Sequence, residues 1–275
     1  AITAKNNINI FGAGTTGNGV EISGAAAMSA NVAGYTGNIN IAGENTTSSG
    51  AAINISNASS TITALNIATL TSSGTGSGTS LVAAGNITVG GELQVENPSS
   101  GTISGVIGGT GMLRKRGGTG AGTLTLTGEN TYTGGTTANG GMLQVGNGGT
   151  TGTLGVGGAI SVGAALSFKR SNTLEISQNI SGVGQISQIG TGTTILTGTN
   201  SYSGTTTISS GGLQIGHSGT TGTLGGGAVS VASFGRSVPT DPASEPSLTQ
   251  NGHAGTGLQC TVAGGEASAL GLPVA

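Results

Sequence analysis

The chain has 275 residues, of which 58 are glycine, 6% are charged and 2% are aromatic. The absence of a strict Gly-x-y period, with only 5 prolines, excludes a collagen helix, and a formal net charge of −2 argues against nucleic acid as a partner, which requires a concentrated positive surface. Hydrophobic residues make up 34% of the chain, so any core consists of many strand-borne aliphatic side chains rather than large aromatic ones.

Residues 1–100 contain aliphatic residues spaced two apart, and glycine-rich segments separate these pairs. The pairs are Ile8 and Ile10, Ile39 and Ile41, Ile53 and Ile55, Leu65 and Ile67, Ile87 and Val89, and Leu93 and Val95. Because successive side chains of a strand point to opposite faces, both members of a pair lie on one face. In Glu92–Glu96 this places Leu93 and Val95 inward and the three polar residues outward. The pattern predicts short, half-buried strands, and the frequent glycine disfavours helix.

The stretch Gly122–Gly155, GTLTLTGENTYTGGTTANGGMLQVGNGGTTGTLG, is followed by a second copy at Gly192–Gly225, and the offset between the copies is constant. The matching residues include Leu126 with Leu196, Asn130 with Asn200, Tyr132 with Tyr202, Leu143 with Leu213, and Leu154 with Leu224. A fixed period indicates a repeat architecture, and one copy has room for about three rungs of a three-sided solenoid. Roughly twelve rungs at ~4.8 Å each would form a rod on the order of 55 Å long. From Gly105 to Gly122 the first copy is seven residues longer than the second from Gly182 to Gly192, and we expect a bulge or loop there.

These patterns divide the chain into three parts. We expect residues 1–100 to hold degenerate solenoid repeats, residues 101–232 to continue the solenoid with two better-kept repeats, and residues 233–275 to form an irregular, poorly ordered tail. The tail contains four of the 5 prolines, and proline removes a donor from a strand ladder. We interpret its departure from the repeat as a reading-frame change near Val231, which sequencing of the parent locus would test.

The pattern G-T-L-T-L-T-G-x-N-T-Y-x-G-G-T-T, followed by G-x-L-Q-V-G, closely resembles the autotransporter-associated β-strand repeat, or passenger-associated transport repeat, of Gram-negative type V autotransporters. The resemblance covers residues 105–162 and 180–231 well, residues 1–101 weakly and the tail not at all. It implies a right-handed parallel β-helix that belongs to the passenger and is displayed at the cell surface or outer membrane, or secreted. In that family such a stack helps the passenger to fold during secretion and serves as a stalk or adhesin, with a host-cell surface or a glycan as the candidate ligand.

The resemblance also implies a partner, the protein's own C-terminal translocator barrel. The chain begins without Met or a signal peptide, and Leu272–Ala275 is no barrel strand, so we expect the chain to be an internal piece of a longer precursor. It contains no run of 18 or more apolar residues, and we therefore expect no transmembrane helix in it.

Few titratable side chains are available for catalysis or metal binding. A Ser-His-Asp arrangement could use only Asp241, and no G-D-S-G or G-x-S-x-G motif occurs. A metal site would need His217 together with His253 or Cys260, which no motif spacing links. Calcium-binding G-G-x-G-x-D repeats are absent. We therefore expect no catalytic residue, no metal ligand and no cofactor, and a protein that is not an enzyme.

Two other functions remain as alternatives, a carbohydrate-active enzyme on a β-helix and an ice-binding solenoid. Glu129 and Glu175 could form the carboxylate pair of a glycosidase or lyase. Thr199 takes the place of Glu129 in the second copy, which favours surface residues without a catalytic role. The T-x-T rows at Thr123–Thr127 and Thr205–Thr207 resemble ice-binding faces, but they do not recur at every rung, and threonine has a high propensity for any exposed strand.

Three further sets of residues have a structural and a functional interpretation. Tyr132 and Tyr202 either stack on a ligand or close the apolar column at a corner, with the hydroxyl group bonded to water or backbone. Asn130 and Asn200 form side-chain ladders or close the turn. The basic run Arg114–Arg116 is either a patch for a polyanion or anionic lipid or, as we expect, a solvated face at an irregular loop.

Overall fold

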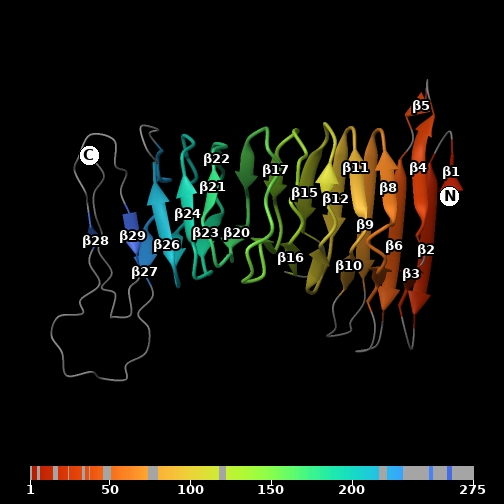
Figure 1. Cartoon of the computed structure of the whole chain (residues 1–275), viewed down its shortest axis with the longest axis horizontal. Helices are drawn as coiled ribbons and strands as arrows, with labels where there is room; N and C mark the ends of the chain where they lie inside the picture. The colour runs from red at the N-terminus through yellow and green to blue at the C-terminus, as the bar shows by residue number, and fades with distance from the viewer. Residues whose placement is uncertain are drawn as a thin grey trace.

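The alternating aliphatic residues form β-strands that stack in parallel along the axis of an elongated, three-sided molecule (Figure 1). The computed structural model describes residues 2–4, 7–14, 18–23, 25–32, 35–36, 38–45, 51–73, 80–117, 122–216, 222–231, 248–249 and 259–261. Within these residues every regular element is a strand, and no helix occurs. The expected all-β fold, a parallel β-solenoid, is confirmed.

The first face consists of two sheets. The earlier sheet contains β1 (Ile2–Thr3), β4 (Ala27–Val32), β8 (Thr61–Ala64), β11 (Asn86–Val89) and β14 (Ile107–Gly108), with β5 (Tyr35–Thr36) antiparallel to β4. The later sheet begins with β21 (Leu174–Ile176), β24 (Thr193–Leu196) and β26 (Gly212–Ile215). Between them, residues 128–135 and 151–158 cross this face without forming a strand.

The other two faces are continuous sheets of eight and ten strands. The second face contains β2 (Ile8–Gly14), β6 (Ile39–Asn45), β9 (Ile67–Ser73), β12 (Glu92–Glu96), β15 (Met112–Arg116), β17 (Thr136–Ala138), β19 (Ile160–Val162) and β22 (Ile180–Ser181). The third face contains β3 (Val20–Ile22), β7 (Ile53–Ile55), β10 (Leu81–Ala83), β13 (Gly101–Ile103), β16 (Thr123–Leu126), β18 (Met142–Val145), β20 (Ala165–Phe168), β23 (Gln185–Gln188), β25 (Thr206–Ile208) and β27 (Val229–Val231).

The stack is shorter than the roughly twelve rungs predicted, because the longest sheet among the described residues has ten strands. The reason lies in the length of the first coils. The register aligns Val20 with Ile53 and Ile53 with Leu81, and both of these steps along the chain are longer than the next one, from Leu81 to Gly101. Because the early coils contain longer connections between their strands, the same number of residues forms fewer rungs than predicted.

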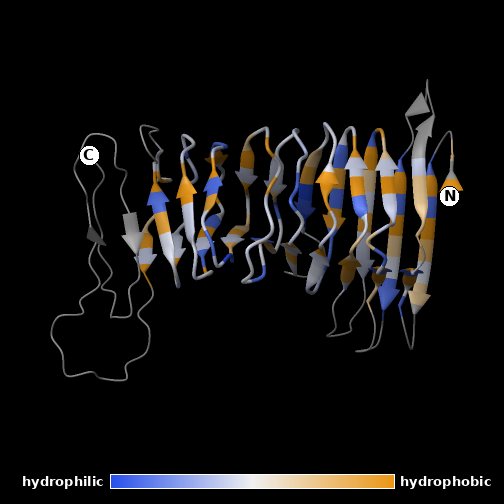
Figure 2. Cartoon of the chain, viewed as in Figure 1, coloured by the Kyte–Doolittle hydropathy of each residue, from blue (hydrophilic) through white to orange (hydrophobic). Residues whose placement is uncertain are grey.

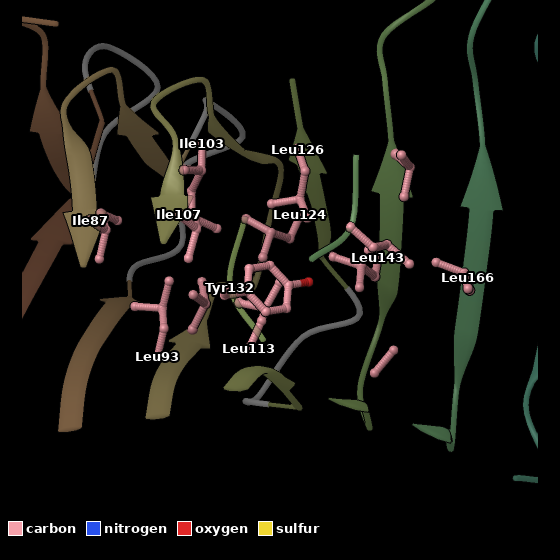
Figure 3. Close-up of a cluster of buried hydrophobic side chains, with 14 of the residues drawn as sticks. Ile87, Leu93, Ile103, Ile107, Leu113, Leu124, Leu126, Tyr132, Leu143 and Leu166 are labelled. Atoms are coloured by element: carbon pink, nitrogen blue, oxygen red, sulfur yellow. The ribbon is translucent and has the colours of Figure 1, made fainter. Parts of the chain in front are cut away.

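The core is one continuous column of inward-facing aliphatic side chains. Leu93 and Val95 are fully buried, as the alternation in β12 predicts, while the polar residues of this strand remain partly exposed. Apolar residues alternate with polar ones along many of the strands (Figure 2). The predicted inward pair Leu65 and Ile67 is an exception, because Leu65 is 42% exposed and Ile67 lies at an outward position of β9, whose inward residues are Ala68 and Leu70. The parallel register sets aliphatic side chains of successive coils above one another, as for Leu124, Leu143 and Leu166 (Figure 3). Each fully buried leucine or isoleucine contributes about 1.5–3 kcal/mol relative to an exposed one.

The two sequence repeats occupy different faces of the solenoid. Three complete coils carry the chain from Leu124 in β16, through Leu143 and Leu166, to Ile186 in β23, and all four residues lie on the third face. A short further segment leads to Thr194 in β24, the repeat equivalent of Leu124, which lies on the first face instead of the third. One repeat therefore makes three turns and a third of another, so the second copy is rotated by one face.

The segment from Ile107 to Asn130 in the first copy is three residues longer than the segment from Ile180 to Asn200 in the second, and the expectation of seven extra residues was wrong. Ile107 and Ile180 are structural equivalents, because each donates its backbone N–H to the asparagine of the repeat that follows. The offset between these two isoleucines exceeds that between Gly122 and Gly192 by only three positions. The prediction matched glycines, but the inward aliphatic residues determine the register.

Within the tail, 233–275, the structure describes two short strands. β28 (Leu248–Thr249) and β29 (Gln259–Thr261) pair antiparallel with each other, and β29 pairs antiparallel with β26. The rest of the tail and the suggested frame change lie outside the described residues.

Candidate functional site

The most constant part of the repeat is a segment in which a side chain replaces the strand ladder. Asn130 follows β16, and its Oδ1 accepts a hydrogen bond from the N–H of Ile107 in the preceding coil at 2.8 Å. Its Nδ2 donates to the carbonyl of Thr153 in the following coil at 2.6 Å. One asparagine thus connects three coils where residues 128–135 form no strand. This is not a ladder of stacked asparagine side chains, because the amide group bonds to backbone groups of the adjacent coils.

The second copy repeats this arrangement on another face. Asn200 Oδ1 accepts from the N–H of Ile180 at 2.8 Å, and its Nδ2 donates to the carbonyl of Thr223 at 2.6 Å. Both asparagines are almost completely buried. We call this arrangement the asparagine clamp: Asn130 with Ile107 and Thr153, and Asn200 with Ile180 and Thr223.

The tyrosines that follow the clamps lie inside the column. Tyr132 and Tyr202 are 0% exposed, so neither is available to stack on a ligand. Tyr132 lies among the aliphatic residues of the core (Figure 3), and its hydroxyl group is 2.7 Å from Thr136 Oγ1. Burial raises the pKa of Tyr132 to about 12, although its hydrogen bonds partly oppose the shift. The hydroxyl group of Tyr202 bonds to Thr206 in the same way, and burial raises its pKa too.

A glycine one coil later makes room for each tyrosine. A Cβ atom on Gly155 would overlap the carbonyl oxygen of Tyr132 and lie 2.5 Å from its ring, and Gly225 has the same close contacts with Tyr202. The glycine of the recurrent G-T-L-G sequence is therefore required by packing against the tyrosine.

The basic run Arg114–Arg116 forms part of strand β15, so the expectation of an irregular loop was wrong. β15 lies parallel to β12, whose outward residues are acidic or polar. Arg114 pairs with Glu92, and Arg116 pairs with Glu96 at 3.1 Å. The two arginines therefore face carboxylates on the neighbouring strand.

The middle residue of this run points into the core. Lys115 is 0% exposed, and its Nζ donates to the carbonyl of Arg116 at 2.9 Å. Burial lowers the pKa of Lys115, and the nearby carboxylate of Glu96 partly opposes this shift. At the equivalent position of the second copy, Gln188 is also buried and donates to the carbonyls of Gly190 and Gly192 at 2.8 and 3.0 Å. Both copies thus place a long polar side chain in the core near the end of the corresponding strand, which is β15 in the first copy and β23 in the second.

Glu129 and Glu175 line one hollow on the first face, with a volume of about 380 Å³. Glu129 Oε1 accepts from the N–H of Gly152 at 3.1 Å, and Glu175 Oε1 accepts from Thr197 Oγ1 at 3.2 Å. Both glutamates are exposed, as expected of surface residues. The sequence analysis considered these two glutamates as a pair and favoured surface residues; they do line the same hollow.

The third face carries one column of hydroxyl and amide groups. The register aligns Thr102, Thr125, Gln144, Ser167, Ser187 and Thr207 at the outward positions of successive coils. Of these, Ser167 is 0% exposed. Beside Thr125, the adjacent outward position holds Thr123 in one coil and Met142 in the next. Paired rows of threonine, which an ice-binding face needs, do not form on these coils.

The remaining candidates from the sequence are placed as follows. His217, His253 and Asp241 lie outside the described residues, and of Cys260 only the backbone, within β29, is described. Among the residues that are described, no three His, Cys, Asp or Glu side chains gather as a metal site. No helix in this part of the chain is long and apolar enough to cross a membrane.

A comparison with known protein families finds a match for the two segments that contain the asparagine clamps. The family model passenger-associated-transport-repeat matches residues 119–145 and 186–215, which include Asn130 and Tyr132 in one copy and Asn200 and Tyr202 in the other. These two segments are similar to the passenger-associated-transport repeat. The chain therefore fits a segment of an autotransporter passenger, and the repeat implies a surface-displayed or secreted protein with a C-terminal translocator as partner. No curated protein and no solved structure matches the chain.

Replacing Asn130 by alanine is expected to destabilise the transport repeat strongly. The substitution leaves the N–H of Ile107 and the carbonyl of Thr153 without this partner, at a cost of about 1–3 kcal/mol for each buried group. The urea midpoint, followed by circular dichroism, should fall for Asn130→Ala and hardly change for Asn147→Ala, which alters an exposed loop residue. Equal midpoints for the two variants would contradict the clamp.

Replacing Lys115 by glutamine, the residue at the equivalent position 188, is expected to stabilise the protein at pH 7. Because burial lowers the pKa of Lys115 below 10.5, the unfolded state binds the proton more tightly, and wild-type stability should rise with pH up to that value. Lys115→Gln should raise the urea midpoint at pH 7 and flatten its rise between pH 7 and 10. A lower midpoint at pH 7 would show that the charged amine stabilises the fold.

Proposed function

We propose that this chain is a non-catalytic segment of an autotransporter passenger, which supports folding coupled to secretion and holds other parts of the passenger away from the cell surface. The observation that carries the proposal is the position of the side chains that define the repeat. Asn130 and Tyr132, with Asn200 and Tyr202, are buried and hold neighbouring coils together. The constant residues of the repeat thus serve the stack itself, and ligand contacts would fall to the residues that vary.

The proposed role in secretion follows from the locality of these contacts. From β10 to β25 each strand of the third face pairs with the strands of the preceding and following coils, so a coil needs only its neighbours to complete its hydrogen bonds. A chain that emerges gradually can therefore add coils one at a time. The finished stack is rigid along its axis, as a stalk requires, and adhesion to a host surface or glycan would be a property of its exposed loops and faces.

One observation favours a carbohydrate-active enzyme as a second candidate. Glu129 and Glu175 come from different coils and line the same hollow. A pair of carboxylates beside one substrate is the arrangement that glycoside hydrolysis uses. Release of reducing ends from a polysaccharide, abolished by Glu129→Gln, would establish this candidate and overturn the proposal of a structural segment.

The proposal is tested by placing the chain between a signal peptide and a translocator barrel in a Gram-negative host. Surface display is measured by the fraction of the chain that external protease removes from intact cells. Asn130→Ala combined with Asn200→Ala should reduce display several-fold, because coils that cannot close onto their neighbours do not drive progressive folding. Asn147→Ala is the matched control and should display normally, and unchanged display of the double variant would contradict a role for the stack in secretion.

A further inference from the structure

The second face carries an exposed aromatic ring near the N-terminal end of the stack, on β2 (Figure 1). Phe11 is 74% exposed, whereas the other aromatic side chains that the structure describes, Tyr132, Phe168 and Tyr202, are fully buried. Single exposed apolar residues are common on protein surfaces and need no ligand. Phe11 differs from these because its ring lines a hollow that also contains polar groups.

The register of three strands determines which residues surround this ring. Phe11 aligns with Ala42 of β6, which aligns with Thr71 of β9, and the positions two residues before and after these also point outward. The outward residues are therefore Asn9, Phe11 and Ala13 in β2, Asn40, Ala42 and Glu44 in β6, and Thr69, Thr71 and Ser73 in β9. Short side chains lie beside the ring, and polar side chains lie around them.

The hollow has a volume of about 380 Å³ and is lined by Phe11 and Glu44, with the small residues Ala13 and Ala42 and the hydroxyl-bearing Ser73. We call it the Phe11 hollow. Ala42 aligns with Phe11, and Glu44 comes two residues later on the same face. With ~4.8 Å between strands and ~3.4 Å per residue, the backbone positions of Phe11 and Glu44 are on the order of 8 Å apart. The Phe11 hollow therefore has room for one six-membered ring between an aromatic wall and a carboxylate.

The polar groups around the ring are free to bind a ligand. Among the described residues, the exposed carboxylate of Glu44 makes no ion pair and accepts no hydrogen bond. On the other side of Phe11, Asn40 Nδ2 donates to Asn9 Oδ1 at 2.7 Å, which orients the two amide groups. Asn9 Nδ2 and Asn40 Oδ1 have no partner in this part of the chain, so they offer one donor and one acceptor side by side.

These groups suit a sugar better than the other ligands that an exposed ring can bind. The face of an aromatic ring is electron-rich and attracts the C–H groups of one face of a hexose, while carboxylate and amide groups bond to its hydroxyl groups. A protein partner of standard size needs about 800 Å² of surface on each side. The outward residues around Phe11 are mostly asparagine, threonine and serine, so the apolar surface at the ring is small.

We propose that the Phe11 hollow binds a neutral hexose unit of a glycan. One face of the sugar packs on Phe11, its hydroxyl groups donate to the carboxylate of Glu44, and the next sugar unit bonds to the amide groups of Asn9 and Asn40. Glu44 is the one carboxylate among the described lining residues, and glycoside hydrolysis uses two, so this site binds a glycan without cleaving it. The site goes beyond the proposed stalk, and binding can be measured without secretion or surface display.

The test uses the full chain and three soluble oligosaccharides. The probes are cellotetraose, mannotetraose and galactotetraose, which present different hexoses without charge. Saturation-transfer nuclear magnetic resonance should show saturable binding of at least one of them, strongest at the C–H groups of one face of a sugar ring. Because the probes are neutral, added salt should leave this binding unchanged.

Variants of the chain locate the binding. Phe11→Ala should weaken binding of that probe about tenfold or more, as expected for loss of an aromatic anchor, and Phe11→Tyr, which keeps the ring, should retain it. Glu44→Gln should weaken binding about threefold to tenfold, because a neutral acceptor replaces a charged one. Val183→Ala is the matched control, since Val183 is 73% exposed and lies outside the hollow, and it should leave binding unchanged. Unaltered circular dichroism spectra would show that these exposed substitutions leave the fold intact.

Three results would overturn the proposal. The absence of saturable binding for all three oligosaccharides would remove the site. Equal binding by Phe11→Ala and the unaltered chain would place the glycan elsewhere on the molecule. Salt-sensitive binding of tetramethylammonium, with all three sugars inert, would make the hollow a site for cations held by the ring and Glu44. None of these results bears on secretion, so failure here is distinguishable from failure of the stalk.

Discussion

Every coil of a parallel stack must hydrogen-bond its backbone to the coil before and the coil after, because its buried N–H and carbonyl groups point along the axis of the stack. Along most of the stack strand ladders meet this requirement. On the first face the ladder stops for two coils after β14, where Asn130 bridges the gap with its own amide group, and on the second face it ends at β22, where Asn200 does the same. The asparagine clamp allows the chain to leave the strand conformation without leaving these buried groups unpaired, and the transport repeat is built around it.

The repeat and the coil have different lengths, and this shapes the surface. Because one repeat makes three turns and a third of another, the clamp of the second copy lies on a different face from the first. The inside of the column is hardly affected, since aliphatic residues face inward on all sides. The outside differs, because each copy presents its variable residues in a new direction. A rod assembled from such repeats can therefore carry distinct surfaces around its circumference while it keeps one kind of core.

The sequence predicted those features that depend on local pattern. Alternation identified inward residues such as Leu93 and Val95, and the match between copies identified the asparagine and tyrosine. The number of rungs depends on coil length and was overestimated. Lys115 was misread for another reason. Lys115 lies two residues after Leu113 in MLRKR, and this spacing places it on the same inward face, but a charged residue was assumed to be exposed to solvent.

The account depends most directly on the parallel stacking of successive coils, which brings residues that are distant in the sequence close together in space. Thr102 and Thr207 are far apart in the chain, but the register places them five steps apart in one outward column of the third face. Spin labels at these two partly exposed positions, measured by pulsed electron resonance, should give a narrow distance distribution centred near about 24 Å, five spacings of ~4.8 Å. A broad distribution, or one centred beyond roughly 35 Å as in an expanded chain, would contradict the solenoid.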